Sequence, residues 1–168
     1  MAYCGGLRLG EILNLTWADI DFEQEMLQVS PKPAGPDTVG WTPKDKDVRV
    51  VPLPTPVVSV LTSLQNAAPE GQVYVFVTAK GPRKGSRINR ANCWRDFQAI
   101  RRRAGIPKCT MHDLRKSYCT NLSAKVPMHV VQELAGHSDI RTTRRYYVQM
   151  RPEFLQVARQ AAEATLES

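Results

Sequence analysis

The chain has 168 residues, 42% of them hydrophobic, which is enough for one domain with a real core and too little for two comfortable ones. Its 23 lysines and arginines against 16 aspartates and glutamates give a formal charge of +7, which favours a polyanionic partner such as nucleic acid. The four cysteines are far apart and no charged-then-apolar leader precedes them, which argues against a secreted protein with a disulfide framework. No run of about 18 apolar residues is present, which argues against a membrane span. We therefore expect a soluble, cytoplasmic protein.

The N-terminal third predicts a short helix and a pair of strands. Apolar residues recur at helical spacing within 7–17 and predict an amphipathic helix only a few turns long. Residues 26–29 form a short apolar run, and 47–54 alternate and are β-branched, so the two could pair across the proline-rich loop 30–43. A small antiparallel sheet near the N-terminus follows.

The rest of the chain predicts helices. Pro56 suits the first turn of a helix over 55–66, and Gly105 ends a helix over 89–104. The run 72–77 is apolar, and its type is left open. Further helices are expected over 112–124, 127–135, 139–149 and 152–166. The fold class is therefore α+β and mainly helical.

Four basic residues in three parts of the chain are candidate functional residues. His112 and Arg115 stand three apart in "HDLR", which places both on one face of a helix, where they could grip a phosphate. The alternative is a capping histidine beside a surface salt bridge. Arg8 stands three residues before Glu11, so an internal ion pair is its alternative role. His137 sits at a corner between two helices, where a turn histidine satisfied by backbone is the alternative.

Two adjacent tyrosines stand in "GHSDIRTTRRYYVQM". A phenol beside arginines could be a DNA nucleophile, a phosphate contact or part of the core. Tyr147, Met150 and Phe154 fall on a core-like helical stripe, whereas Tyr146 lies about 100 degrees round the helix and is freer to reach a phosphate. Tyr146 also stands four residues before Met150, so this support is modest.

Four segments in their order and spacing resemble the catalytic domain of the tyrosine recombinases, or phage integrases: "GLRLGEILNLTWADID", "KDKDVRVVPLP", "TMHDLRKSYCTNL" and "ELAGHSDIRTTRRYY". The resemblance covers essentially all of residues 1–168. It implies the catalytic-domain fold of that family and an integrase or recombinase that breaks and rejoins DNA through a 3′-phosphotyrosine intermediate. The catalytic residues that it implies are Arg8, Lys44, His112, Arg115, His137 and Tyr146.

Two of these assignments depend on spacing within the family. The family lysine typically stands eight residues before the proline of the "VPL" segment, which selects Lys44 and leaves Lys46 as the alternative. The family tyrosine typically falls nine residues after the second histidine, which selects Tyr146.

The chemistry needs no metal or other cofactor. Arginines clamp the charged transition state, a lysine can protonate the departing 5′ oxygen, and His112 can assist the phenol. No carboxylate cluster with metal-ligand spacing appears, which argues against a two-metal nuclease. Cys109 and His112 form only a partial zinc-ligand pair.

The expected partners are double-stranded DNA and other recombinase protomers, with a tetramer in synapsis and a monomer alone. Basic side chains should hold the DNA backbone, although a solvated surface is the alternative for each. The candidates are Lys80, Arg83, Lys84, Arg87, Arg90 and Arg101.

The chain also departs from the family pattern. Ala135 replaces a common leucine and Lys116 a common histidine, but neither is a proposed catalytic residue. We expect the N-terminal core-binding domain and the first catalytic-domain helices to be absent from this chain, so the isolated fragment could be inactive. Alternative functions are a non-catalytic DNA-binding module of the same fold, a type IB topoisomerase and a generic basic scaffold.

Overall fold

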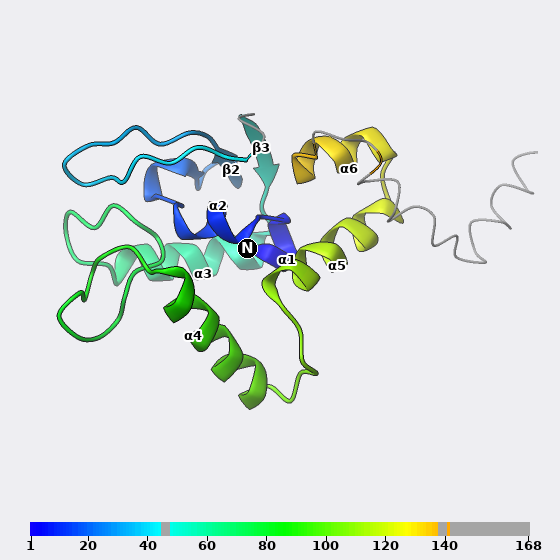
Figure 1. Ribbon diagram of the computed structural model, residues 1–168. Coiled ribbons are helices and arrows are strands. Elements are labelled where there is room, and N and C mark those ends of the chain that lie inside the picture. The colour runs from blue at the N-terminus through cyan, green and yellow to red at the C-terminus, as the bar shows by residue number, and fades with distance from the viewer. Residues whose placement is uncertain (45–47, 138–140, 142–168) are drawn as a thin grey trace, which may run out of the picture.

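The computed structural model describes residues 1–44, 48–137 and 141. Within these ranges, helices surround a small antiparallel sheet (Figure 1), so the predicted mainly helical α+β class is confirmed. None of the described helices is long and apolar enough to cross a membrane. In chain order the elements are α1 (Ala2–Gly5), α2 (Leu9–Leu13), the 3-10 helix η1 (Trp17–Asp19), β1 (Ile20–Asp21), β2 (Met26–Val29), β3 (Arg49–Pro52), α3 (Thr55–Asn66), α4 (Arg90–Arg103), α5 (Met111–Ser123) and α6 (Met128–Ala135).

The sheet has the order β1-β2-β3 and is antiparallel throughout. Leu27 pairs with Val51 and Val29 with Arg49, and all four of these residues are buried. Because side chains alternate across a strand, Arg49 shares the buried face of β3 with Val51. The inward face of the sheet therefore carries one charged side chain among apolar ones.

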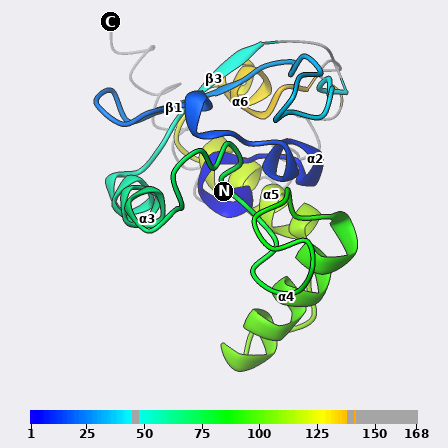
Figure 2. The same cartoon turned by 90° about the vertical axis from the view of Figure 1, so that its left-hand side faces the viewer.

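Two groups of buried side chains hold the elements together. The larger group joins α1, α2 and the sheet to α3, with Leu7, Leu27 and Leu61 each no more than 2% exposed. The smaller group joins α5 to α6 around Cys119 and Val131. Helix α5 also packs along α1, whereas α4 projects away from the sheet in both views (Figures 1 and 2). Packing on α1 and α6 thus fixes α5 relative to the sheet.

The predicted helix over 7–17 is shorter than expected. Helix α2 ends at Leu13 because the side chain of Asn14 is held in two hydrogen bonds. Its Nδ2 donates to the carbonyl of Gly10 at 2.7 Å, and its Oδ1 accepts from Arg87 Nη1 at 2.6 Å. The following backbone pairs instead with the apolar run 72–77: the amide of Val75 donates to the carbonyl of Leu15 at 3.0 Å. That run forms isolated bridges and no regular strand.

Several other boundaries agree with the sequence. The helices expected over 55–66, 89–104, 112–124 and 127–135 correspond to α3, α4, α5 and α6, with ends shifted by at most one residue. The short elements α1 and β1 were not predicted. The helices expected over 139–149 and 152–166 lie outside the described residues, apart from residue 141.

A first prediction concerns Gly6, which ends α1 with φ of 62°. A Cβ there would lie 2.4 Å from the Tyr118 ring, so Gly6→Ala combines left-handed strain with overpacking. We expect the free energy of unfolding to fall by about 2–5 kcal/mol, measured by urea denaturation. Gly71→Ala is the control, because Gly71 has φ of 78° but open space around it, and should lose about 1–2 kcal/mol. Equal losses would show that the ring contact is unimportant.

Candidate active site

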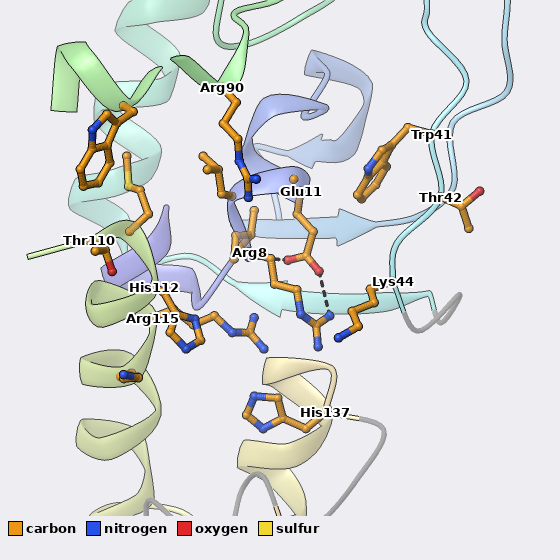
Figure 3. Close-up of a pocket in the computed structure, with 16 residues that line it drawn as sticks. Arg8, Glu11, Trp41, Thr42, Lys44, Arg90, Thr110, His112, Arg115 and His137 are labelled. Atoms are coloured by element: carbon orange, nitrogen blue, oxygen red, sulfur yellow. Dashed lines mark hydrogen bonds and ion pairs between the residues drawn. The ribbon is translucent and has the colours of Figure 1, made fainter. Parts of the chain in front are cut away.

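Five of the six predicted catalytic side chains line one cavity of about 1250 Å³, namely Arg8, Lys44, His112, Arg115 and His137. They come from the start of α2, the loop before β3, the first turns of α5 and the end of α6, and Figure 3 shows them facing a common space. The sixth, Tyr146, lies outside the described residues. The structure therefore brings segments from both ends of the described chain to one place.

Arg115 is the most deeply buried of the five, at 3% exposure. A capping box starts its helix, in which the Asp113 carboxylate accepts from the Thr110 amide at 2.9 Å and from its hydroxyl at 2.7 Å. The guanidinium donates to the carbonyls of Gly6 and Ala135. Burial, and next the positive charge of Arg8, lower the pKa of Arg115. The guanidinium is thus held rigidly in surroundings that favour a compensating anion.

Arg8 is anchored beside Arg115 from a different element. Its backbone amide donates to Glu11 Oε2 at 2.7 Å, and its Nη1 donates to Glu11 Oε1 at 3.2 Å. Its Nη2 donates to the carbonyl of Gly136 at 2.5 Å. Because Arg115 donates to Ala135, the two guanidiniums are tied to consecutive carbonyls at the end of α6. The two guanidiniums therefore lie at the same end of α6, where the charge of Arg8 acts on Arg115.

Glu11 and Arg49 form a buried ion pair that the sequence analysis did not recognise. Arg49 Nη1 and Nη2 donate to Glu11 Oε1 and Oε2 at 3.0 and 2.7 Å, and both residues are less than 9% exposed. Burial alone would raise the pKa of Glu11, but the hydrogen bonds and charge of Arg49, with those of Arg8, outweigh it and lower the pKa. The signal that could have revealed the pair is an arginine on the inward face of a strand, where it needs an acidic partner.

The loop that carries Lys44 is fixed at its base. Lys32 Nζ lies 2.5 Å from Asp19 Oδ1, and the backbones of Lys32 and Trp41 exchange hydrogen bonds of 2.7 and 2.9 Å. Trp41 then lines the cavity together with Lys44. Lys46 lies outside the described residues, so the choice between the two lysines stays a prediction.

The two histidines approach the cavity from separate helices. His112 is the second residue of α5, one turn before Arg115, and its side chain is exposed. His137 follows Gly136, whose φ of 62° ends α6. The amide of His137 donates to the carbonyl of Gln132 at 3.0 Å, and Gln132 Nε2 donates back to the carbonyl of His137 at 3.1 Å. The helix end therefore orients His137.

The cavity suits an anion. Its described lining carries three arginines and two lysines, Arg8, Arg90, Arg115, Lys44 and Lys116, against the carboxylate of Glu11. Among residues 1–44, 48–137 and 141, no three His, Cys, Asp or Glu side chains gather to hold a metal ion. A phosphate group would compensate this charge without a metal.

The predicted DNA-binding residues fall into two groups. Lys80, Arg83 and Lys84 are exposed on the loop before α4, and Arg90 is exposed where it lines the cavity. The other two also have partners within the protein, since Arg87 donates to Asn14 and Arg101 Nη1 donates to the carbonyl of Ile106 at 2.7 Å. The structure leaves the DNA contacts of all six as predictions.

Comparison with known proteins gives consistent matches. The model of the phage integrase family matches residues 1–153. The tyrosine recombinase XerC-like protein of Caldanaerobacter subterraneus subsp. tengcongensis is 33% identical over 91% of this chain and 45% of its own length. Tyrosine recombinase XerA of Pyrococcus furiosus is 30% identical over 87% of this chain and 47% of its own. The chain thus spans about half the length of these relatives.

Solved structures show the same fold. The integrase of transposon Tn1549, in complex with transposon right end DNA, superposes with a TM-score of 0.75 at 21% identity, covering 96% of this chain and 56% of that one. The crystal structure of XerA recombinase gives a TM-score of 0.71 at 24% identity, covering 95% and 54%. These likenesses confirm the predicted fold.

A second prediction concerns Glu11→Gln. At neutral pH the change leaves the charges of Arg49 and Arg8 without a buried carboxylate and should lower the free energy of unfolding by about 3–5 kcal/mol. The pKa of Glu11 is lowered in the folded protein, so its stabilisation is full above its unfolded pKa of about 4.3 and is lost as the pH falls through the folded pKa. The difference between wild type and variant should therefore shrink in acid, as measured by urea denaturation at several pH values.

The control is Asp96→Asn, because Asp96 pairs with Arg95 at 3.9 Å and both side chains are more than half exposed. It should change the free energy of unfolding by about 0.5 kcal/mol or less. A difference for Glu11→Gln that stays constant into acid would contradict the ionised pair.

Proposed function

Since the chain belongs to the phage integrase family, we propose that it is the catalytic domain of a site-specific tyrosine recombinase that cleaves and rejoins double-stranded DNA. The observation that carries the proposal is the anchoring of Arg8 and Arg115 to the consecutive carbonyls of Gly136 and Ala135, beside two histidines and a lysine. This arrangement fits one phosphodiester held by two arginines. The domain comprises residues 1–168, works inside the cell and needs no cofactor.

The two arginines are the electrostatic part of the mechanism. Nucleophilic attack on a phosphodiester concentrates negative charge on the two non-bridging oxygens. Arg8 and Arg115 donate to these oxygens, and because their positions are fixed before the DNA binds, little reorganisation is needed in the transition state. Arginine keeps its proton at neutral pH, so both act as clamps and not as bases.

The remaining groups move protons and exchange the ester. The Tyr146 oxygen attacks phosphorus and gives up its proton with the assistance of His112, while the bond from phosphorus to the 5′ oxygen breaks. Lys44 donates a proton to that 5′ oxygen, and His137 donates a hydrogen bond to the phosphate. The product is a 3′-phosphotyrosine and a free 5′ hydroxyl. Attack by the hydroxyl of another strand reverses these steps and rejoins the DNA without an external energy source.

The relatives support DNA as the substrate. Two of them are named tyrosine recombinases, and the solved neighbours include XerH bound to its difH substrate in addition to the Tn1549 integrase on DNA. Strand exchange between two DNA sites needs several active sites, so we propose that the protein is a monomer alone and a tetramer in synapsis. The exposed Lys80, Arg83 and Lys84 would then hold the DNA backbone.

A third prediction tests the nucleophile. A suicide substrate nicked near the cleavage site should become attached to the protein through a 3′ phosphate, with a core-binding domain added if needed. Tyr146→Phe removes only the attacking oxygen, so the adduct should vanish while DNA affinity stays within about twofold. Tyr147→Phe is the matched control and should retain the adduct, with a stability loss of about 1 kcal/mol at most. Peptide mapping that places the DNA on Tyr147, or an adduct that survives in Tyr146→Phe, would refute the assignment.

A fourth prediction concerns the nature of the DNA contacts. Affinity should fall linearly on logarithmic axes as salt rises, because binding releases counterions. Lys84→Ala removes one exposed charge and should reduce that slope by about 1. Strand cleavage should persist in EDTA. Cleavage that disappears with EDTA and returns with magnesium would instead indicate a metal-dependent nuclease.

A further inference from the structure

Arg49 lies behind the cavity and connects three segments of the chain. Its guanidinium binds both carboxylate oxygens of Glu11 in α2, and its Nε donates to the carbonyl of Leu134 in α6 at 3.0 Å. It also packs against Gly136 so closely that a Cβ there would lie 2.8 Å from Arg49 Nη1. Arg49 is not among the described residues that line the cavity, so it would act on a bound anion only through its neighbours.

The first connection leads to Arg8. Glu11 accepts from the backbone amide and from Nη1 of Arg8 with the same two oxygens that Arg49 holds. A carboxylate gripped on both oxygens by a planar fork has one orientation. That orientation determines where the Arg8 guanidinium stands, so Arg49 sets the position of Arg8 through Glu11.

The second connection leads to His137 and Arg115. Three consecutive carbonyls at the end of α6 accept from three different arginines: Leu134 from Arg49, Ala135 from Arg115, and Gly136 from Arg8. His137 follows directly. If Arg49 were lost, the last turn of α6 would lose a donor, and the helix end that carries His137 could shift relative to β3.

Stability alone gives a poor reason for this arrangement. A buried ion pair is often no more stabilising than apolar residues of the same volume. Here Arg8 and Arg49 both bind the carboxylate of Glu11, and Arg115 is near enough to feel its charge, so three guanidiniums share one carboxylate and the cluster is positively charged before any anion binds. Such a cluster is better explained by a requirement for fixed geometry at a phosphate.

We propose that Arg49 is a positioning residue that acts through Glu11 and through the end of α6 to hold Arg8 and His137 in register on one phosphate. The effect of Arg49 on the reaction rate rests on the proposed function. Its effect on phosphate binding does not, because any phosphate that binds between Arg8 and Arg115 needs the same alignment of these residues.

The test compares two Arg49 variants with a control on the same strand. Arg49→Met removes the charge and the fork, whereas Arg49→Lys keeps the charge but cannot bind Glu11 on both oxygens and donate to Leu134 together. Val51→Ala is the control, because Val51 is fully buried on the same face of β3 and destabilises by loss of packing alone. Should Arg49→Met fail to fold, Arg49→Lys decides the outcome.

Two measurements are made on each protein. The first is the rise in melting temperature caused by inorganic phosphate at constant ionic strength. The second is the single-turnover rate of adduct formation with saturating suicide DNA, corrected for the folded fraction. We expect Arg49→Met to lose the phosphate-dependent rise and to slow adduct formation by roughly 10–100-fold, as for other residues that orient ligating groups. Arg49→Lys should fall between it and wild type, and Val51→Ala should match wild type in both.

The outcomes separate the two proposals. The decisive variant is Arg49→Met, or Arg49→Lys if Arg49→Met does not fold. If its phosphate response and its adduct rate both lie within twofold of those of Val51→Ala, the positioning role is overturned and the proposed function stands. A wild-type protein that forms no adduct even with a core-binding domain added, but shows a phosphate response that depends on Arg49, would overturn the proposed function and leave the positioning role standing. A wild-type protein without a phosphate response would overturn the positioning role.

Discussion

The hydrogen bonds that three arginines donate to the last turn of α6 are the interaction on which the rest of the site depends. A helix leaves its final carbonyls without donors of its own, and here Leu134, Ala135 and Gly136 each accept from an arginine on another segment. The negative end of the helix dipole partly offsets the positive charge that gathers there. Docking of α6 and assembly of the anion site are thus the same event, because the groups that hold the helix also face or support the cavity.

These hydrogen bonds explain why glycines stand at positions 136 and 6. Gly136 ends α6 in the left-handed conformation and leaves room for Arg49, two requirements that exclude a side chain. Gly6 does the same at the end of α1, where its carbonyl accepts from Arg115 and its Cα faces Tyr118. Both glycines stand where a guanidinium must approach the backbone closely.

Much of the fold could be predicted from local signals. Asn89 and Thr110 are the N-cap residues of α4 and α5, and their side chains accept hydrogen bonds from amides of the first turn. Such capping residues can be recognised in the sequence. Helix α2 was overextended because the group that ends it, Asn14, is held by Arg87 from 73 residues away. The two-residue strand β1 exists only through pairing with β2, so its sequence carries no signal of its own.

The site was predictable to the extent that motifs mark it. The resemblance selected Arg8, His112, Arg115 and His137 as candidates, and the structure brings them to one cavity with Lys44, which leaves their catalytic roles as predictions. It did not locate Arg49, because pairing across 38 residues leaves no periodic trace. The sequence indicated Glu11 only as a partner of Arg8, which stands three residues before it. Its second partner, Arg49, is 38 residues away, and spacing along the chain gives no sign of that pair.

The hydrogen bonds between Lys32 and Trp41 divide the loop before β3 into two parts. Residues 33–40 form a closed excursion beyond this pair, with a turn in which the Gly35 amide donates to the carbonyl of Thr38 at 3.0 Å, and Asp37 is exposed at its tip. Lys44 lies on the other side of the pair. A fluorescent reporter attached at the exposed tip would therefore be separated from Lys44 by the hydrogen bonds between Lys32 and Trp41, so the tip is a suitable place for a probe of the cavity that leaves its lining unchanged.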